Sequence, residues 1–148
     1  MPFYLQYLAK WPRICFADLH GPSRETRMGY VMGKAEGRAT NWHGHVTAVT
    51  VAPQFRRLGL ARELMATLER VSDVDYCGYF VDLFVRSSNA LAIAMYERMG
   101  YVTYRRVLDY YQGEEDALDM RKALSRDPDR KSMVPLGRDI TPEELMQG

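Results

Sequence analysis

The stretch Val46–Ala61, VTAVTVAPQFRRLGLA, decides the fold, because it passes from a strand into a helix through a short turn. Its three valines are β-branched residues among small neighbours, a pattern typical of a buried strand. Pro53 has no N–H group to give to a sheet, so we expect the strand to end near it. From Leu60 onward, apolar residues recur at i, i+4, i+8 and i+11, which predicts a helix.

The turn between this strand and helix has the composition of an anion-binding site. The first N–H groups of a helix have no partner within the helix, and the helix dipole adds partial positive charge. Gly59 has no Cβ atom, so a ligand can approach the backbone, and Arg56 and Arg57 add two cations. These features favour a pyrophosphate at Arg56–Ala61, with an ordinary turn carrying solvated arginines as the alternative interpretation.

Composition places the chain among folded globular proteins. It has 148 residues, 47% of them hydrophobic, which is enough for one domain with a core. A net charge of +1 argues against a strongly electrostatic nucleic-acid or membrane binder. We interpret Cys15 and Cys77 as reduced core residues, and no apolar run has the length of a signal sequence or membrane span. We therefore expect a soluble cytoplasmic protein.

Strand and helix patterns alternate along the rest of the chain. Phe3–Leu8 could form one or two helical turns that stop before Pro12. Asn89 is placed to cap a helix that Gly100 ends. The remaining pattern predicts strands at 13–18, 27–36, 43–52, 78–86, 101–109 and 117–123, and helices at 60–72 and 90–99. The spacing of the early strands suits an antiparallel meander.

A second motif follows the first after about one strand-helix unit. Residues 89–101 contain the pattern Asn-x-x-Ala-x-x-x-Tyr-x-x-x-Gly-Tyr, built on Asn89 and Tyr96. In this order, the two motifs resemble the GCN5-related N-acetyltransferase (GNAT) family, an α/β fold with a mixed, mostly antiparallel twisted sheet flanked by helices. Within that family the chain resembles the catalytic subunits of NatB N-terminal acetyltransferases. That closer similarity is carried by FYLQYL at 3–8, GYVMGKAEG at 29–37, HGHVTA at 43–48, FVDLFVR at 80–86 and DMRKALSRD at 119–127.

The resemblance implies acetyl transfer from acetyl-CoA to a protein α-amino group, with no metal. It implies that backbone groups of the strand hold pantetheine and that one N–H, that of Val51, polarises the thioester carbonyl. Asn89 would reach the pantetheine arm, and Tyr96 would both contact the cofactor and protonate the leaving thiolate. The complete set of implied cofactor-binding residues is Val49, Thr50, Val51, Arg56, Arg57, Leu58, Gly59, Leu60, Ala61, Asn89 and Tyr96.

Enzymes of the NatB type act on an initiator methionine followed by an acidic residue or its amide. His45 and Thr47 alternate onto one strand face, where both could donate to such a side chain. Tyr110 and Tyr111 lie in the loop that closes over the peptide backbone in the family. The alternative for His45 is a satisfied core histidine. An α-amine titrates at about pH 7.7–8.0, so a strong base is not required, and direct attack in a ternary complex is the simplest mechanism.

The resemblance also carries expectations about domains and partners. Residues 1–124 would form the acetyltransferase domain, and 125–148 an extended tail. Such subunits usually have another strand and helix before the position of Met1, so we expect the strand at 13–18 to present an open edge. A large helical-repeat auxiliary subunit and the ribosome are the implied partners. Two alternatives stay open: an acetyltransferase acting on lysine or small amines, and an inactive acetyl-CoA-binding subunit.

Overall fold

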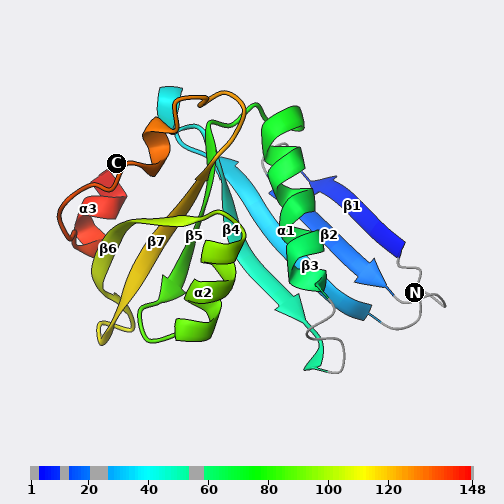
Figure 1. Ribbon diagram of the computed structural model, residues 1–148, viewed down its shortest axis with the longest axis horizontal. Coiled ribbons are helices and arrows are strands. Elements are labelled where there is room, and N and C mark those ends of the chain that lie inside the picture. The colour runs from blue at the N-terminus through cyan, green and yellow to red at the C-terminus, as the bar shows by residue number, and fades with distance from the viewer. Residues whose placement is uncertain (1–3, 11–13, 21–26, 54–58, 148) are drawn as a thin grey trace.

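The computed structural model describes residues 4–10, 14–20, 27–53 and 59–147. Seven strands form one sheet in the order β1-β2-β3-β4-β5-β7-β6 (Figure 1). Every neighbouring pair is antiparallel except β4 and β5, which are parallel. The strands are β1 (Tyr4–Lys10), β2 (Ile14–His20), β3 (Arg27–Glu36), β4 (His43–Val51), β5 (Phe80–Arg86), β6 (Val102–Tyr111) and β7 (Glu115–Ala123). The predicted α/β class with a mixed, mostly antiparallel sheet is confirmed.

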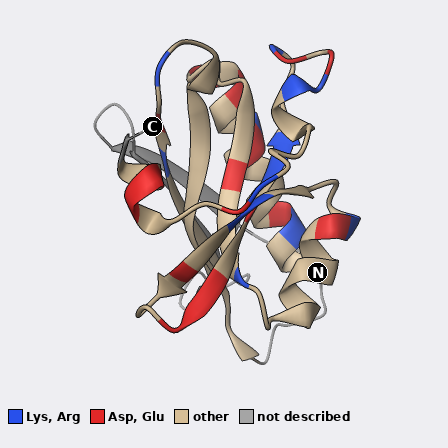
Figure 2. Ribbon diagram, turned by 90° about the vertical axis from the view of Figure 1, so that its left-hand side faces the viewer, with Lys and Arg blue, Asp and Glu red and all other residues tan. Residues whose placement is uncertain are grey.

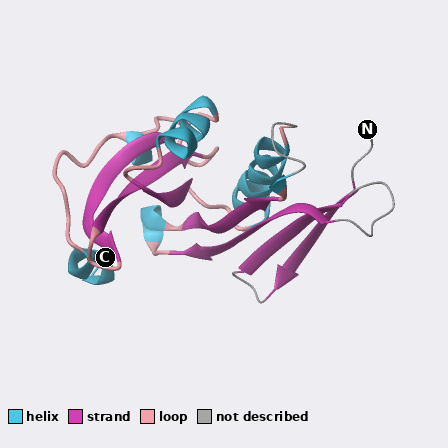
Figure 3. Cartoon of the chain, turned by 90° about the horizontal axis from the view of Figure 1, so that it is seen from below, coloured by secondary structure: helices cyan, strands magenta, loops and turns pink. Residues whose placement is uncertain are grey.

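Helices cover both faces of this sheet. Helices α1 (Leu60–Arg70) and α2 (Ala90–Arg98) lie on one face, and the short α3 (Pro142–Gln147) lies on the other (Figure 3). Helix α1 continues into a π-helical turn at Val71–Asp75, so the helical segment runs beyond the predicted end. No helix among the described residues is long and apolar enough to span a membrane.

The main core lies between the sheet and α1. Leu64, Met65 and Leu68 of α1 are at most 1% exposed and pack with Val81 and Met120 of the sheet. Burial of one such side chain stabilises the fold by about 1.5–3 kcal/mol. The i, i+4 spacing that predicted α1 therefore arises from a single stripe of residues facing the sheet.

The N-terminal segment differs from the prediction. Residues 4–10 form strand β1 and pair with all seven residues of β2, instead of forming helical turns. One or two isolated turns would leave most backbone groups without helical partners, whereas pairing with β2 satisfies both segments. The expectation of an open edge at residues 13–18 is therefore wrong, because β1 covers that edge and is itself the outermost strand.

The C-terminal segment packs on the face opposite to α1. It was predicted to be extended, but it contains a 3-10 turn at Lys131–Met133 and ends in α3. Ile140 is 1% exposed and bridges to Val107 of β6, in a small second core with Ala117. Cys77 was interpreted as a core residue, but it is exposed, because it lies in the loop that leads into β5.

Candidate active site

Parallel strands β4 and β5 stay together only briefly. Their register pairs are Gly44 with Val81, His45 with Asp82, and Val46 with Leu83, and the two strands then diverge (Figure 1). Beyond this point β4 continues to pair with β3 on its other side. A strand that leaves its neighbour exposes part of its backbone edge to a ligand. The predicted pantetheine-binding residues Val49, Thr50 and Val51 lie on this diverging half of β4.

A β-bulge starts the diverging half. Val46 pairs with Gly33 and Ala48 with Met32, so Thr47 is an extra residue without a register partner in β3. The bulge shifts the alternation by one residue, and Val49 and Val51 consequently pack on the same core as Val46. Thr47 is exposed at this position. The sequence predicted that His45 and Thr47 point to the same face of a regular strand, but the bulge interrupts the regular alternation at Thr47.

The N-terminus of α1, which the sequence predicts to bind phosphate, follows the diverging half of β4 in the chain. Gly59 precedes the helix with a φ angle of 75°, which a side chain would strain, and a Cβ atom there would meet no described atom within 4 Å. The first helical hydrogen bond runs from the Glu63 N–H to the Gly59 carbonyl, at 3.2 Å. The N–H groups of Leu60 and Ala61 therefore precede the helical ladder. Arg56, Arg57 and Leu58 lie outside the described residues.

Helix α2 supplies the two residues of the second motif. The Asn89 side chain caps the helix by accepting a 3.1 Å hydrogen bond from the Ala92 N–H, as predicted. Tyr96 is half-buried and lies edge-on to Tyr101, with ring centroids 6.0 Å apart. Burial, together with nearby Tyr111, raises the pKa of Tyr96 above 10.0. The phenol is therefore protonated at neutral pH and is able to donate a proton.

On the opposite face of the sheet, two histidines surround a buried carboxylate. Nδ1 of His45 lies 2.7 Å from Oδ1 of Asp82, and Nε2 of His43 lies 3.4 Å from the same oxygen. Glu36 borders the pair, with Oε1 at 3.6 Å from Nε2 of His43. Asp82 is only 5% exposed, so its charge depends on these imidazole partners. We call His43, His45, Asp82 and Glu36 the histidine cluster.

The opposite charges in this cluster stabilise one another. Burial alone would lower the pKa of His43, but hydrogen bonds to Asp82 and Glu36 outweigh it and raise this pKa from 6.5 to about 10. The pKa of His45 is raised in the same way, mainly through Asp82. Burial opposes ionisation of Asp82, yet the two histidines hold its pKa below 3.8. The imidazole of His43 is therefore charged at neutral pH, and the pKa of His45 is shifted in the direction that favours its charged form.

Aromatic rings connect this cluster to the end of β6. The ring of Phe84 lies 5.4 Å from His45 and 5.0 Å from Tyr110, edge-on in both cases. Tyr110 in turn contacts Tyr111 at 5.1 Å, and the guanidinium of Arg86 lies 4.3 Å over the Tyr111 ring. The structure thus brings together His45, Tyr110 and Tyr111, which are far apart in the sequence.

An irregular segment fixes the two tyrosines. The register between β6 and β7 shifts between Val107 and Tyr111, and Asp109 has a positive φ angle of 52°. The Asp116 carboxylate stabilises this bulge by accepting hydrogen bonds from the Asp109 N–H at 2.9 Å and from Arg106 at 2.8 Å. Tyr110 and Tyr111 therefore belong to the end of β6, rather than to a separate loop.

Sequence reasoning missed His43, Asp82, Glu36 and Phe84 as members of the site. The signal was present in two places: the His-x-His repeat at the start of β4, and one acidic residue inside the otherwise apolar strand β5. An acidic residue at the centre of a buried strand needs a partner. Its partners come from other strands, so the sequence did not identify them.

Comparison with known protein families identifies the class of protein to which the chain belongs. The family of GNAT acetyltransferases matches residues 2–101. The chain belongs to this family.

Within the family, several relatives of the chain are catalytic subunits of N-terminal acetyltransferase B complexes. The N-terminal acetyltransferase B complex catalytic subunit NAA20 of Arabidopsis thaliana is 61% identical over 145 residues, covering 98% of this chain and 82% of the relative. A crystal structure of Chaetomium thermophilum Naa20 in complex with a bisubstrate analogue has a TM-score of 0.78 and 38% identity, covering 88% of this chain and 77% of that one. A chain in the structure of a NatB acetyltransferase complex bound to CoA and MES has a TM-score of 0.66 and 42% identity, covering 74% of this chain and 72% of that one.

Proposed function

We propose that this protein is the catalytic subunit of an N-terminal acetyltransferase of the NatB type. It transfers the acetyl group of acetyl-CoA to the α-amino group of chains that begin with Met followed by Asp, Glu, Asn or Gln. The observation that carries this proposal is the divergence of β4 and β5 beyond Val46 and Leu83, directly before the start of α1. The relatives named above include a complex bound to CoA and a subunit bound to a bisubstrate analogue.

Acetyl-CoA fits the helix face of this opening. The backbone of Val49–Val51 is placed to hold the pantetheine arm, and the N–H of Val51 to polarise the thioester carbonyl. The start of α1 at Gly59–Ala61 suits the pyrophosphate, together with Arg56, Arg57 and Leu58. The amide nitrogen of Asn89 remains for the cofactor, because its Oδ1 atom caps α2.

The reaction needs positioning more than a strong base. The free amine attacks the thioester carbon, and the tetrahedral intermediate collapses with cleavage of the C–S bond, so that CoA leaves as a thiolate and the new amide nitrogen releases one proton to solvent. Tyr96 is the proton donor to that thiolate, because it is held as a neutral phenol. About a tenth of α-amines are already uncharged at neutral pH, so no strong base is needed. Close alignment of the amine and the thioester therefore supplies much of the rate.

The second residue of the acceptor is read by the histidine cluster. Because Nδ1 of His45 is bound to Asp82, the other nitrogen, Nε2, remains for the substrate. A charged imidazole donates from Nε2 to a carboxylate or amide oxygen, and Thr47 adds a hydroxyl. Tyr110 and Tyr111 are placed to hold the peptide backbone. A site of this kind discriminates against side chains that lack the oxygen.

A partner and a location complete the proposal. The chain works in the cytoplasm, at the ribosome, with a large helical-repeat auxiliary subunit as in NatB complexes.

The test is acetylation of a peptide panel by the full chain, alone and paired with the auxiliary subunit. The panel contains Met-Asp, Met-Leu and Ser-Ala N-termini and one peptide with an internal lysine. Acetylation of Met-Asp peptides above the other three supports the proposal. Preference for lysine, or acetyl-CoA binding by calorimetry without turnover in the paired complex, would overturn it.

A further inference from the structure

A buried arginine lies beside the histidine cluster and has no acceptor for its hydrogens within the part of the chain that the structure describes. Arg121 of β7 is 8% exposed, and it makes no hydrogen bond or ion pair with any described residue. Its Nε atom is fully buried and unpartnered. A guanidinium has five N–H donors, and burying them without acceptors is costly. Such a group is expected to have an anionic partner.

Two aromatic rings hold this guanidinium in a fixed plane. Its central carbon lies 3.6 Å from the centroid of Tyr104 and 4.2 Å from that of Phe80. The other side of Phe80 is stacked on His43, with centroids 4.5 Å apart and an interplanar angle of 6°. A planar guanidinium fixed between rings loses little further freedom when it binds a carboxylate or phosphate through two parallel hydrogen bonds.

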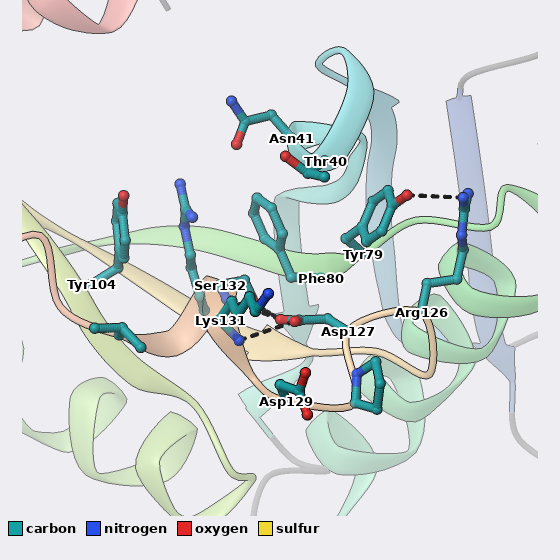
Figure 4. Close-up of a pocket in the computed structure, with 13 residues that line it drawn as sticks. Thr40, Asn41, Tyr79, Phe80, Tyr104, Arg126, Asp127, Asp129, Lys131 and Ser132 are labelled. Carbon is teal, nitrogen blue, oxygen red and sulfur yellow. Dashed lines mark hydrogen bonds between the residues drawn. The ribbon is translucent and has the colours of Figure 1, made fainter.

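The guanidinium lines a pocket of about 390 Å³. Figure 4 shows the rings of Tyr104, Phe80 and Tyr79 along this pocket, with Asn41 and Thr40 on its rim. This volume lies in the range of small-ligand sites. The pocket is thus large enough for an anionic group and part of the molecule that bears it.

Among the cations that line the pocket, Arg121 is the buried one, and its Nε has no acceptor among the described residues. Asp127 accepts hydrogen bonds from the N–H of Lys131 at 3.0 Å and from the N–H of Ser132 at 2.9 Å, so its carboxylate is occupied. Arg126 donates to the Cys77 carbonyl and to the Tyr79 hydroxyl, both at 2.9 Å. Asp129 and Lys131 add one charge of each sign. On this side of the molecule, acidic and basic segments are interspersed rather than separated (Figure 2).

Neither of the two buried carboxylates near Arg121 forms an ion pair with it. Asp119, two residues earlier in β7, is paired with Arg105 instead, whose Nε lies 2.8 Å from Oδ2. The other oxygen of Asp119 is also buried, and no described residue donates a hydrogen bond to it. Asp82 lies opposite Arg121 in the sheet register, but its oxygen is taken by the two histidines.

We propose that the Arg121 pocket is a binding site for an oxyanion, a carboxylate or phosphate group, that pairs with the guanidinium of Arg121. The oxyanion can come from two sources. One is a free anion, and the other is an acidic side chain of the acceptor chain beyond its second residue. The second source rests on the proposed function. His45, Asp82 and Arg121 lie on three adjacent strands, so His45 and Arg121 are about 10 Å apart across the sheet, a span of about three extended residues.

The first experiment is a titration of the full chain with inorganic phosphate at constant ionic strength, observed through the Arg121 Nε–H signal by NMR. Saturable movement of that signal supports the site, whereas movement no larger than in a chloride titration overturns it. In Arg121→Lys, which keeps the charge but loses the planar fork, phosphate should bind at least about tenfold more weakly by calorimetry. Arg138→Gln is the control, since Arg138 is exposed and pairs with Glu144 away from the pocket. Equal weakening in both variants would also overturn the proposal.

The second experiment separates the sources. Peptides that start with Met-Asp carry either Glu or Gln at the fourth, fifth or sixth position. A lower KM for Glu in the native protein, lost in Arg121→Lys, supports the site with the acceptor chain as its source. Phosphate binding without such a preference supports it with a free anion as the source. If no peptide is acetylated, the proposed function fails, while the phosphate titration still decides the pocket.

Discussion

Nδ1 of His45 lies 2.7 Å from Oδ1 of Asp82, and this contact joins β4, the strand that we propose binds the acetyl donor, to its parallel neighbour β5. The contact fixes which nitrogen of His45 remains for a substrate. It also supplies the negative charge that raises the pKa of this imidazole and so favours its protonated form. In the proposed function, specificity for the second residue therefore depends on a pair of residues from β4 and β5 rather than on His45 alone.

Replacement of His45 by Ala should weaken selectively the acetylation of Met-Asp and Met-Glu peptides. Loss of a charged hydrogen-bond donor costs about 1.5–3 kcal/mol, so kcat/KM for these peptides should fall about 10- to 150-fold. Slow activity on Met-Leu peptides should change little, because leucine has no oxygen to bind. An equal loss on Met-Leu peptides would contradict the assigned role.

Replacement of Asp82 by Asn tests the charge rather than the hydrogen bond. The amide oxygen can still accept from Nδ1, but the negative charge that raises the pKa of His45 is gone. A histidine with a raised pKa keeps its charge to higher pH, and the variant should therefore lose the charged imidazole at lower pH than the native protein. We expect the ratio of Met-Asp to Met-Asn acetylation to fall about tenfold at pH 8.

The pH profile of that ratio is the measurement. In Asp82→Asn the preference should decline through pH 6–7, near the ordinary imidazole pKa, and in the native protein it should persist to higher pH, because Asp82 raises the pKa of His45. Circular dichroism verifies that the variant is folded. A profile that is identical in the two proteins would refute the role of Asp82 as a positioning residue.

Replacement of Tyr96 by Phe removes the proton donor without changing the packing against Tyr101. We expect kcat to fall about tenfold and the peptide KM to stay nearly constant. The effect is modest because a thiol has a pKa near ~8.5, so its thiolate is already a fair leaving group. Unchanged kcat would remove the acid role from Tyr96.

These expectations also show how far the sequence alone reaches. Strand β4 and the start of α1 follow from local patterns, and so do the cap at Asn89 and the helix end at Gly100. The bulge at Thr47 does not, because it is defined by the register with β3. Asp82 was visible as an unusual residue, but its histidine partners are 37 and 39 positions away. Long-range pairing, which a linear pattern does not encode, assembles the specific part of the site.

The histidine cluster should also make stability depend on pH. The pKa of His43 is raised from 6.5 to about 10 in the folded state. The stabilisation from a raised histidine pKa is complete below the unfolded value and is lost as pH rises through the folded value. The free energy of unfolding should therefore fall by about 2–4 kcal/mol between pH 7 and 9.5 from this group.

The matched variant is His43→Gln, which keeps a polar side chain but does not titrate. Urea unfolding of both proteins at several pH values between 7 and 9.5 gives the two slopes. The variant should be less stable at pH 7, because Asp82 and Glu36 lose a charged partner, but its stability should vary much less with pH. Burial around His43 and its stacking on Phe80 do not change with pH, so only the titrating charge produces a difference in slope. Parallel slopes in the two proteins would show that His43 is not held in its charged form by Asp82 and Glu36.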